Sequence, residues 1–384
     1  MYKILTNNKP KNVLIFFSME TYTRNSLTSI IFNHVINYPT PQNFNYYFGY
    51  GSLSLLCLGI QIVSGILLAM HYIPSSDLAF LSVEHIMRDV QLGWFIRYAH
   101  ANGASMFFIC LYIHLLRGIY YGSFIYPRTY TWFTGFIIFI LTIATAFLGY
   151  VLPWGQMSFW AATVITNLFS VIPFVGNSIV EWLWGGFSVA SPTLNRFFSL
   201  HFLLPFVITG LVAVHISFVH KTSSNNPLAI TNNNFISFYP YFFIKDLLGV
   251  EVFLIFFSFF LFNAPNLLGH PDNYVYADSL STPAHIVPEW YFLPLYAILR
   301  SIPSKKMGVA YMGLTLAVLM NFPFRNKSLT KGSSFCLNSK VSFWFFVFNG
   351  IFLGWLGQKA MEYPYLDIGV FSSLTFVWSV WYQK

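Results

Sequence analysis

Hydrophobic residues in this chain gather in long, nearly unbroken blocks separated by more polar segments. Eight blocks approach the roughly 20 residues that an α-helix needs to cross the hydrocarbon core of a bilayer. They cover residues 48–70, 95–119, 131–152, 197–219, 243–262, 306–323, 341–357 and 366–382. The sixth block is the weakest, because Lys305 and Lys306 crowd its start and Pro323 its end. We predict an all-α integral membrane protein with eight transmembrane helices.

Composition and charge agree with this fold class and give it an orientation. Of the 384 residues, 56% are hydrophobic and only 8% are charged, whereas about 25% are charged in an average soluble protein. With alternating helices, the side that holds both termini carries 13 of the 20 Lys and Arg but 3 of the 12 Asp and Glu, a net +10 against −2 opposite. The positive-inside rule then places both termini on the inner side. The net charge of +8 thus reflects topology, and we expect no nucleic-acid partner.

The segment before the first block is interpreted as a retained extension. It has no small-residue cleavage site of the kind that ends a signal peptide, and its basic residues around a short apolar patch are Lys3, Lys9, Lys11 and Arg24. The three cysteines show no metal or redox spacing, and two of them are predicted to be helix packing residues. These two are Cys57 and Cys110, and the third is Cys336.

Two of the predicted helices carry a pair of histidines at the same interval. The second reads HANGASMFFICLYIH from His100 to His114, and the fourth reads HFLLPFVITGLVAVH from His201 to His215. Fourteen residues are just under four helical turns, so the histidines of one helix share a face and lie about 21 Å apart along its axis. The two helices run in the same direction, because one crossing lies between them. His100 therefore shares a depth with His201, and His114 with His215.

Matched histidine pairs at two depths favour haem over simpler explanations. A single intramembrane histidine can be a hydrogen-bonded packing residue or a step in a proton path. Zinc favours a tighter cluster with more ligands. Two imidazoles from parallel helices instead suit the opposite axial positions of a haem. A haem ligated on both faces has no open position, which favours electron transfer over oxygen binding.

Glycines repeat the histidine interval on the first and third predicted helices. Glycine inside a helix costs up to about 1 kcal/mol relative to alanine and is usually explained by close helix packing. Recurrence at the histidine interval suggests that flat macrocycle edges rest against bare backbone at Gly51, Gly65, Gly135 and Gly149. Arginines three or five residues from a histidine either snorkel or pair with haem propionates. They are Arg97, Arg117 and Arg196.

Several longer stretches resemble the cytochrome b family, the haem-bearing subunits of ubiquinol–cytochrome c oxidoreductase, or respiratory complex III. They are SGILLAMHY at 64–72, RYAHANGASMFFICLYIHLLRG at 97–118, GYVLPWGQMSFW at 149–160, SNNPL at 224–228 and PEWYFLPLYAILRSIP at 288–303. The resemblance implies that the first four helices form a bundle around two b-type haems. His100 and His201 would ligate the low-potential haem, and His114 and His215 the high-potential haem.

The resemblance also implies a quinol-oxidation site on the acid-rich side. Pro288 and Glu289 begin the family's PEWY motif in the loop between the fifth and sixth predicted helices, and Tyr150 and Tyr296 match tyrosines of the same pocket. A carboxylate in a partly apolar pocket, its pKa raised, can accept a quinol proton and release it outward. We therefore expect Glu289, Tyr150 and Tyr296 to be catalytic and Pro288 to contribute to binding.

On the basic side, four residues match the family's quinone-reduction site. His220 lies five residues after the haem ligand His215, at the helix exit, so this site adjoins the high-potential haem. A histidine and a carboxylate together can deliver the protons that quinone reduction consumes. The four residues are His220, Ser224, Lys245 and Asp246.

The function implied by the resemblance is ubiquinol oxidation with electron bifurcation. One electron leaves to the Rieske iron–sulfur protein, and the other passes through both haems to reduce quinone. Protons leave on the acid-rich side and enter on the basic side, which makes the complex a translocase. The implied partners are cytochrome c1, the other complex III subunits, a second copy in a homodimer of the complex, and lipids such as cardiolipin. The implied location is the mitochondrial inner membrane, with both termini on the matrix side.

The expected organisation has three parts, with two departures from the family pattern. Residues 1–44 form an N-terminal extension and surface segment, 45–222 the four-helix di-haem bundle, and 223–384 a four-helix region with the PEWY loop. Tyr46 and Tyr47 precede Phe48 and Gly49 where relatives commonly have paired tryptophans followed by asparagine. Ala161 stands where the family usually has glycine. We expect its methyl group to narrow the outer quinol pocket and lower sensitivity to methoxyacrylate-type inhibitors.

Two functions from other classes remain open. A di-haem anchor that conducts electrons for a dehydrogenase needs the histidine pairs but no PEWY loop. An ion or solute transporter needs intramembrane ionisable residues without haem. A reduced-minus-oxidised spectrum separates the transporter from the other two.

Overall fold

Helices occupy all eight hydrophobic blocks. The computed structural model describes residues 29, 32–230, 234–325 and 331–382, so most of the N-terminal extension lies outside the described residues. The eight long helices are α2 (Tyr50–Ala69), α4 (Gly93–Tyr120), α5 (Thr129–Val151), α8 (Ser191–Thr222), α9 (Tyr241–Phe262), α11 (Lys305–Met320), α13 (Leu337–Gly357) and α14 (Tyr365–Tyr382). The all-α class of the protein is confirmed.

Five of these helices are long and apolar enough to cross a bilayer, counted over the described residues: α2 with its preceding turn, α4, α5, α8 and α13. Helix α9 carries Lys245, Asp246 and Glu251, and α11 has only 16 residues. Along α9, large apolar side chains such as Val252 and Ile255 are exposed, as suits a surface that faces lipid. The number of eight spans stays a prediction.

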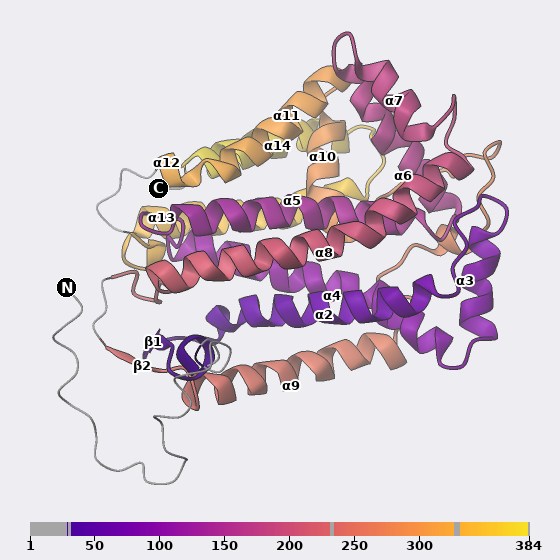
Figure 1. Ribbon diagram of the computed structural model, residues 1–384. Coiled ribbons are helices and arrows are strands. Elements are labelled where there is room, and N and C mark those ends of the chain that lie inside the picture. The colour runs from indigo at the N-terminus through magenta and orange to yellow at the C-terminus, as the bar shows by residue number, and fades with distance from the viewer. Residues whose placement is uncertain (1–28, 30–31, 231–233, 326–330, 383–384) are drawn as a thin grey trace.

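Long helices run side by side, and short elements cover their two ends (Figure 1). One end carries α3 (Ala79–Arg88), α6 (Gln156–Asn167) and α7 (Gly176–Trp184). At the other end, strands β1 (Pro39–Pro41) and β2 (Phe235–Ser237) pair antiparallel with Thr40 opposite Ile236. Two further helices are α10 (Leu293–Ser301) and α12 (Phe322–Arg325). Pro323 falls in α12, so α11 ends before it, as proline requires.

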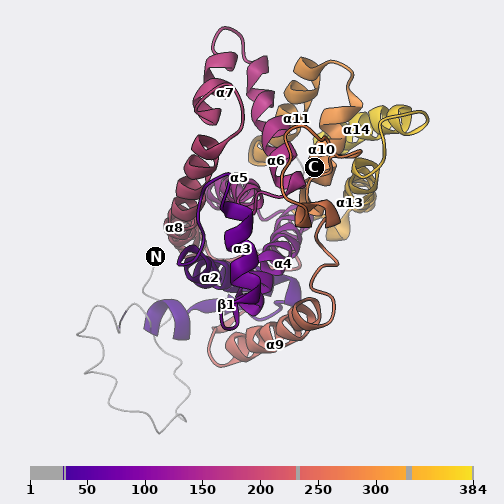
Figure 2. The same ribbon diagram turned by 90° about the vertical axis from the view of Figure 1, so that its right-hand side faces the viewer.

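Helices α2 and α4 pack against each other, as do α5 and α8, and these four form the bundle seen end-on in Figure 2. A buried cluster between α2, α4 and α9 includes Cys57 and Cys110, which are packing residues as predicted. A second cluster joins residues of α4 and α5, such as Leu111 and Phe136, to Leu353 of α13. The two halves of the chain therefore share a core, and the proposed division at residue 222 stays a prediction.

Candidate functional site

The four predicted histidines meet in two pairs inside the bundle. The ring centres of His100 and His201 lie 6.1 Å apart, and those of His114 and His215 lie 6.4 Å apart. Two metal–nitrogen bonds of about 2.0 Å, with roughly 1.1 Å from each nitrogen to its ring centre, span about 6.2 Å. Each pair is therefore spaced as two axial ligands of one metal would be. Within the described residues, no group of three or more His, Cys, Asp or Glu could hold a metal ion.

Hydroxyl groups on neighbouring helices orient two of these imidazoles. The Oγ of Ser64 on α2 lies 3.0 Å from Nδ1 of His100, and Oγ1 of Thr134 on α5 lies 3.1 Å from Nδ1 of His215. Each hydroxyl already donates its single hydrogen to a carbonyl one turn back, that of Ile60 or Tyr130. The hydroxyls must then accept from Nδ1–H. Nε2 of both rings is left without a hydrogen, the state in which a neutral imidazole binds a metal.

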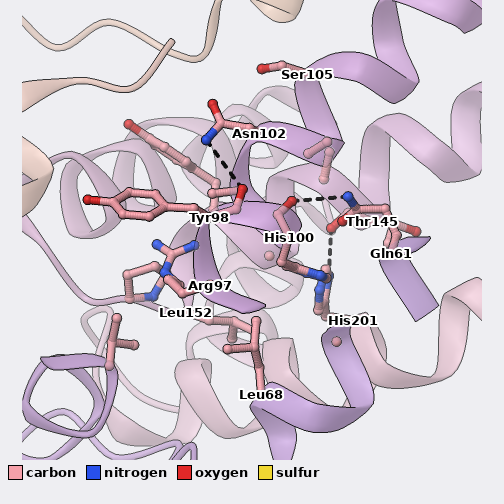
Figure 3. Close-up of a pocket in the computed structure, with 18 of the residues that line it drawn as sticks. Gln61, Leu68, Arg97, Tyr98, His100, Asn102, Ser105, Thr145, Leu152 and His201 are labelled. Carbon is pink, nitrogen blue, oxygen red and sulfur yellow. Dashed lines mark hydrogen bonds between the residues drawn. The ribbon is translucent and has the colours of Figure 1, made fainter. Parts of the chain in front are cut away.

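His201 is oriented in the same way, whereas His114 is not. Nδ1 of His201 donates to the carbonyl oxygen of Thr145 on α5 at 2.8 Å (Figure 3). The Arg117 guanidinium lies 3.1 Å from Nδ1 of His114. Because a guanidinium has only donors, this Nδ1 accepts, and the ring hydrogen sits on Nε2. Metal binding through Nε2 of His114 requires that the Arg117 guanidinium move away from Nδ1, which leaves the guanidinium free to pair with an anion.

Each predicted glycine faces one histidine of the neighbouring helix. A Cβ atom added to Gly51 would come within 3.1 Å of the His114 ring, and one added to Gly135 within 3.0 Å of the His215 ring. Gly65 faces His100 at 3.1 Å, and Gly149 faces His201 more closely still. The glycines thus make room for the imidazoles themselves. That they also accommodate macrocycle edges stays a prediction.

A matched pair of variants on α2 tests this role. Gly65→Val should weaken haem binding at the His100–His201 pair by about tenfold to a hundredfold. The reason is that overpacking commonly costs about 1–3 kcal/mol. Gly59→Val is the control, since nothing lies within 4 Å of a Cβ atom there. Haem content of the purified protein, measured by its absorption spectrum, checks the prediction. Equal losses in the two variants would contradict it.

A cavity of about 530 Å³ surrounds the first histidine pair and continues to the loop before α10. His100, His201 and Arg97 line it, as do Tyr150 and Glu289. Figure 3 shows His100 and His201 converging in this pocket beside Arg97, with the side-chain amide of Gln61 donating to the His100 carbonyl. The His100–His201 pair, predicted to hold a haem, and Glu289, the predicted proton acceptor, therefore share one cavity.

Glu289 is half-buried in the wall of this cavity. Burial raises the pKa of its carboxyl to about 7, although the positive charge of Arg97 and the Tyr150 side chain both lower it. The Tyr150 hydroxyl is buried without a hydrogen-bond partner among the described residues, so its approach to Glu289 is electrostatic and not a well-directed hydrogen bond. A carboxyl that titrates near neutral pH beside an unpaired hydroxyl suits proton transfer with a polar ligand.

The other two residues predicted for the outer site, Tyr296 and Pro288, lie outside the cavity lining, whereas Tyr291 of the PEWY motif is part of it. Tyr296 does not line it; its hydroxyl donates to the Ile286 carbonyl at 3.0 Å. Tyr291 does line it, with its ring stacked on Phe108 at 4.1 Å. Pro288 is half-buried beside Glu289, outside the lining. Catalytic roles for Tyr150, Tyr296 and Glu289, and a binding role for Pro288, stay predictions.

Two further residues have other contacts than those expected of them. Arg196 donates to the Trp182 carbonyl and lies over the Trp182 ring at 5.7 Å, outside the cavity lining. Ala161 of α6 is buried, 5% exposed, but it also lies outside the lining. The structure thus gives the expected narrowing of the quinol pocket by the Ala161 methyl group no support. The predicted loss of inhibitor sensitivity is untested.

The four residues predicted for the inner site lie at the other end of the bundle, each with its own contacts. Asp246 accepts from Ser52 Oγ at 2.9 Å and lies against Gly49. Lys245 donates to the Phe44 carbonyl and lies over the Tyr46 ring. Ser224 is held through its carbonyl by Arg128. The departures at Tyr46 and Gly49 are thus in contact with the predicted inner-site residues.

His220 lies beside two residues that were not predicted from the sequence. His34 and Tyr38 contact its ring from the segment before β1. The hydroxyls of Ser64 and Thr134, which contact His100 and His215, were also not predicted from the sequence. Both directly precede a predicted glycine, which is the one signal that could have found them.

Comparisons with known proteins cover nearly the whole of this architecture. Residues 35–223 match the family described as Cytochrome b/b6/petB, and residues 276–377 match the one described as Cytochrome b(C-terminal)/b6/petD. The chain is 58% identical to a cytochrome b of Phytophthora megasperma over 92% of each chain. It is 59% identical to a cytochrome b of Marchantia polymorpha, over 90% of this chain and 85% of the relative. A solved structure described as a hyperthermophilic respiratory complex III superposes with a TM-score of 0.88 at 32% identity, over 95% of this chain and 98% of that one.

Proposed function

Since the chain belongs to the cytochrome b family of respiratory complex III, whose members bind b-type haem, we propose that its four intramembrane histidines hold two haems. His100 with His201 hold the low-potential haem near the end that carries α3, α6 and α7. His114 with His215 hold the high-potential haem near the opposite end. The observation that carries this proposal is the spacing of the ring centres, 6.1 and 6.4 Å.

The surroundings of the histidines fit this group. Three of the four rings present Nε2 without a hydrogen, and each ring lies against a glycine that leaves it space. Arg97 lines the cavity beside His100 and His201. Arg117 loses its contact with His114 when that histidine binds a metal, so its guanidinium is then free. Both arginines can pair with the negative charges of haem propionates. When bound, the haems supply one-electron redox chemistry. The chain supplies ligand orientation, charge pairing and an apolar surrounding.

At the outer site, we propose that Glu289 accepts a proton from ubiquinol as it is oxidised. The carboxyl needs to be ionised to do this, and a pKa near 7 keeps a large fraction ionised while leaving it basic enough to hold the proton. Tyr150 presents its unpaired hydroxyl in the same cavity and can orient the quinol oxygen. One electron would pass to a Rieske iron–sulfur protein, and the two haems held by the histidine pairs would supply the path by which the other moves inward.

At the inner site, His220 and Asp246 provide the protons that reduction of ubiquinone consumes, with Ser224 and Lys245 helping to bind it. The partners that we propose are cytochrome c1, the Rieske protein, further complex III subunits, a second copy of the complex and lipids such as cardiolipin. The proposed location is the mitochondrial inner membrane with both termini on the matrix side, in agreement with the charge asymmetry of the loops. Together these steps contribute to the proton gradient and place the complex in the translocase class.

A redox titration of the isolated native complex tests the proposal. We expect two b-type components of different potential, together with quinol–cytochrome c reductase activity. One component alone would contradict the two-haem assignment. Two components without quinol oxidation would instead favour a di-haem anchor of a dehydrogenase, and a spectrum without haem would favour a transporter.

A second prediction concerns the hydroxyl that orients His215. Thr134→Val keeps the shape of the side chain but removes the acceptor for Nδ1–H, and such partners of metal ligands are typically worth 10–100-fold in affinity or activity. We expect a changed midpoint potential or lower occupancy of the high-potential haem alone. Thr209→Val is the matched control, because Thr209 is exposed on α8 and its hydroxyl bonds only the Pro205 carbonyl of its own helix. If both variants behave alike, the Thr134 hydroxyl does not orient His215.

A further inference from the structure

His34 and His220 form a hydrogen-bonded pair of imidazoles at the inner end of the bundle. Their Nδ1 atoms lie 2.8 Å apart, their ring planes differ by 18°, and their ring centres are 5.0 Å apart. A linear N–H···N bond of this length, with roughly 1.1 Å from each nitrogen to its ring centre, separates the centres by about 5.0 Å. The rings therefore lie end to end in nearly one plane, in the geometry of a direct hydrogen bond.

The two rings differ in their access to water. His34 comes from the helical turn Phe32–Ile36 and is exposed, whereas His220 is half-buried in the last turns of α8. Tyr38 covers one face of the His220 ring at 4.2 Å. Its hydroxyl donates to the Val219 carbonyl. His34 is thus the exposed member of the pair.

The charged and titratable groups around the pair are few. Tyr38 packs on His220, and burial raises the pKa of its phenol, against lowering by Ser223, Ser224 and the charge of Arg128. Lys221 follows His220 and is exposed. With Tyr38 neutral, the shared hydrogen lies between two imidazoles, of which His220 is the more buried.

We propose that His34 is the proton-entry residue of the quinone-reduction site and passes protons to His220. This proposal rests on the proposed role of His220. Two neutral imidazoles joined at Nδ1 share one hydrogen, and either ring can donate it. The relay starts from the tautomers in which His34 donates, His220 has its hydrogen on Nε2, and Nε2 of His34 is bare. The quinone gains two electrons through the haem path and two protons, and the pair delivers one of these protons at each passage.

Each passage balances in atoms and charge. A proton from water bonds to Nε2 of His34. The shared hydrogen then shifts from Nδ1 of His34 to Nδ1 of His220. The Nε2–H bond of His220 breaks as the reduced quinone oxygen takes that proton. When the pair then separates, His34 loses its Nε2 hydrogen to water and gains one at Nδ1, while His220 loses its Nδ1 hydrogen to water and gains one at Nε2. Both rings regain their starting tautomers with no net change in protons.

The test measures reoxidation of the high-potential haem by quinone in the intact complex. His34→Ala should slow this step by about tenfold, since water replaces the imidazole less efficiently. Added imidazole should restore much of the rate by carrying protons to His220. His34→Asn should remain slow, because an amide can keep a hydrogen bond to His220 but cannot relay a proton at neutral pH. His71→Ala, an exposed histidine at the opposite end, is the control and should behave as native.

The outcomes separate this inference from the function on which it rests. A native rate in His34→Ala together with a slow His220→Ala overturns the relay and leaves the inner site in place. Full activity in His34→Asn, or no rescue of His34→Ala by imidazole, shows a structural role and also overturns the relay. A native rate in His220→Ala refutes both the relay and the proposed inner site. Unchanged haem content in each variant confirms that the rate reports chemistry and not folding.

Discussion

His100→Ala is expected to yield a complex that contains the high-potential haem and lacks the low-potential one. The remaining ligand, His201, is held in place by the Thr145 carbonyl, but one axial bond does not replace two. Loss of a partner that only orients a ligand already costs 10–100-fold, so quinol oxidation should fall by more than about a hundredfold. Redox titration of the b-type absorption and steady-state turnover measure the two effects.

The reciprocal variant is the control for this result. His114→Ala should remove the other component and leave the His100–His201 pair occupied, because the two pairs share no ligand. If either single variant abolished both components, the pairs would not be independent sites. If His100→Ala and His114→Ala each left two components, the histidines would not be the ligands.

Glu289→Gln is expected to slow quinol oxidation by about a hundredfold or more while both haems assemble normally. The amide keeps the shape of the side chain and loses its basicity, and a positioned general base typically contributes 10²–10⁴-fold. Glu181→Gln, in the exposed part of α7 at the same end of the bundle, is the matched control. Native turnover in Glu289→Gln would mean that another group or water accepts the proton.

The pH dependence gives this prediction a definite sign. With a carboxyl pKa of about 7, raised by burial, the ionised, proton-accepting form is about one-tenth of the total at pH 6 and about nine-tenths at pH 8. The rate of the native enzyme should therefore rise across this interval. Glu289→Gln should lack that rise, which pre-steady-state oxidation of quinol at several pH values will show. An identical profile in both proteins would assign the titration to another group.

The helices and the histidine pairs followed from sequence because they depend on simple periods. Blocks of about 20 apolar residues predict spans, and an interval of 14 residues on parallel helices predicts two depths. The helix ends were less accurate. Helix α8 begins six residues before the predicted start at 197 and so includes a segment that is not strongly apolar. Pro192 suits the first turn of a helix, and the Thr193 hydroxyl accepts a hydrogen bond from the Ala190 N–H at the helix start.

The local chemistry of the site could not be predicted in the same way. Ser64 and Thr134 appear in the sequence as ordinary intrahelical hydroxyls, and only the fold brings them to imidazoles of other helices. Glu289 meets Arg97 and Tyr150 because a long loop folds back over the bundle. No helical period encodes that path. His34 lies 186 positions from His220, in a segment without a motif.

The 14-residue interval along α4 and α8 also has an electrical consequence. In the proposed arrangement, about 21 Å of a hydrocarbon core roughly 30 Å thick lies between the two pairs, so an electron moving inward crosses about two thirds of the transmembrane potential. The inner side of an energised membrane is negative, so this transfer performs work of about 1.6 kcal/mol per 100 mV. A fixed helical spacing therefore converts a difference in haem potential into stored voltage. The same spacing lets a high membrane voltage slow electron flow through the chain.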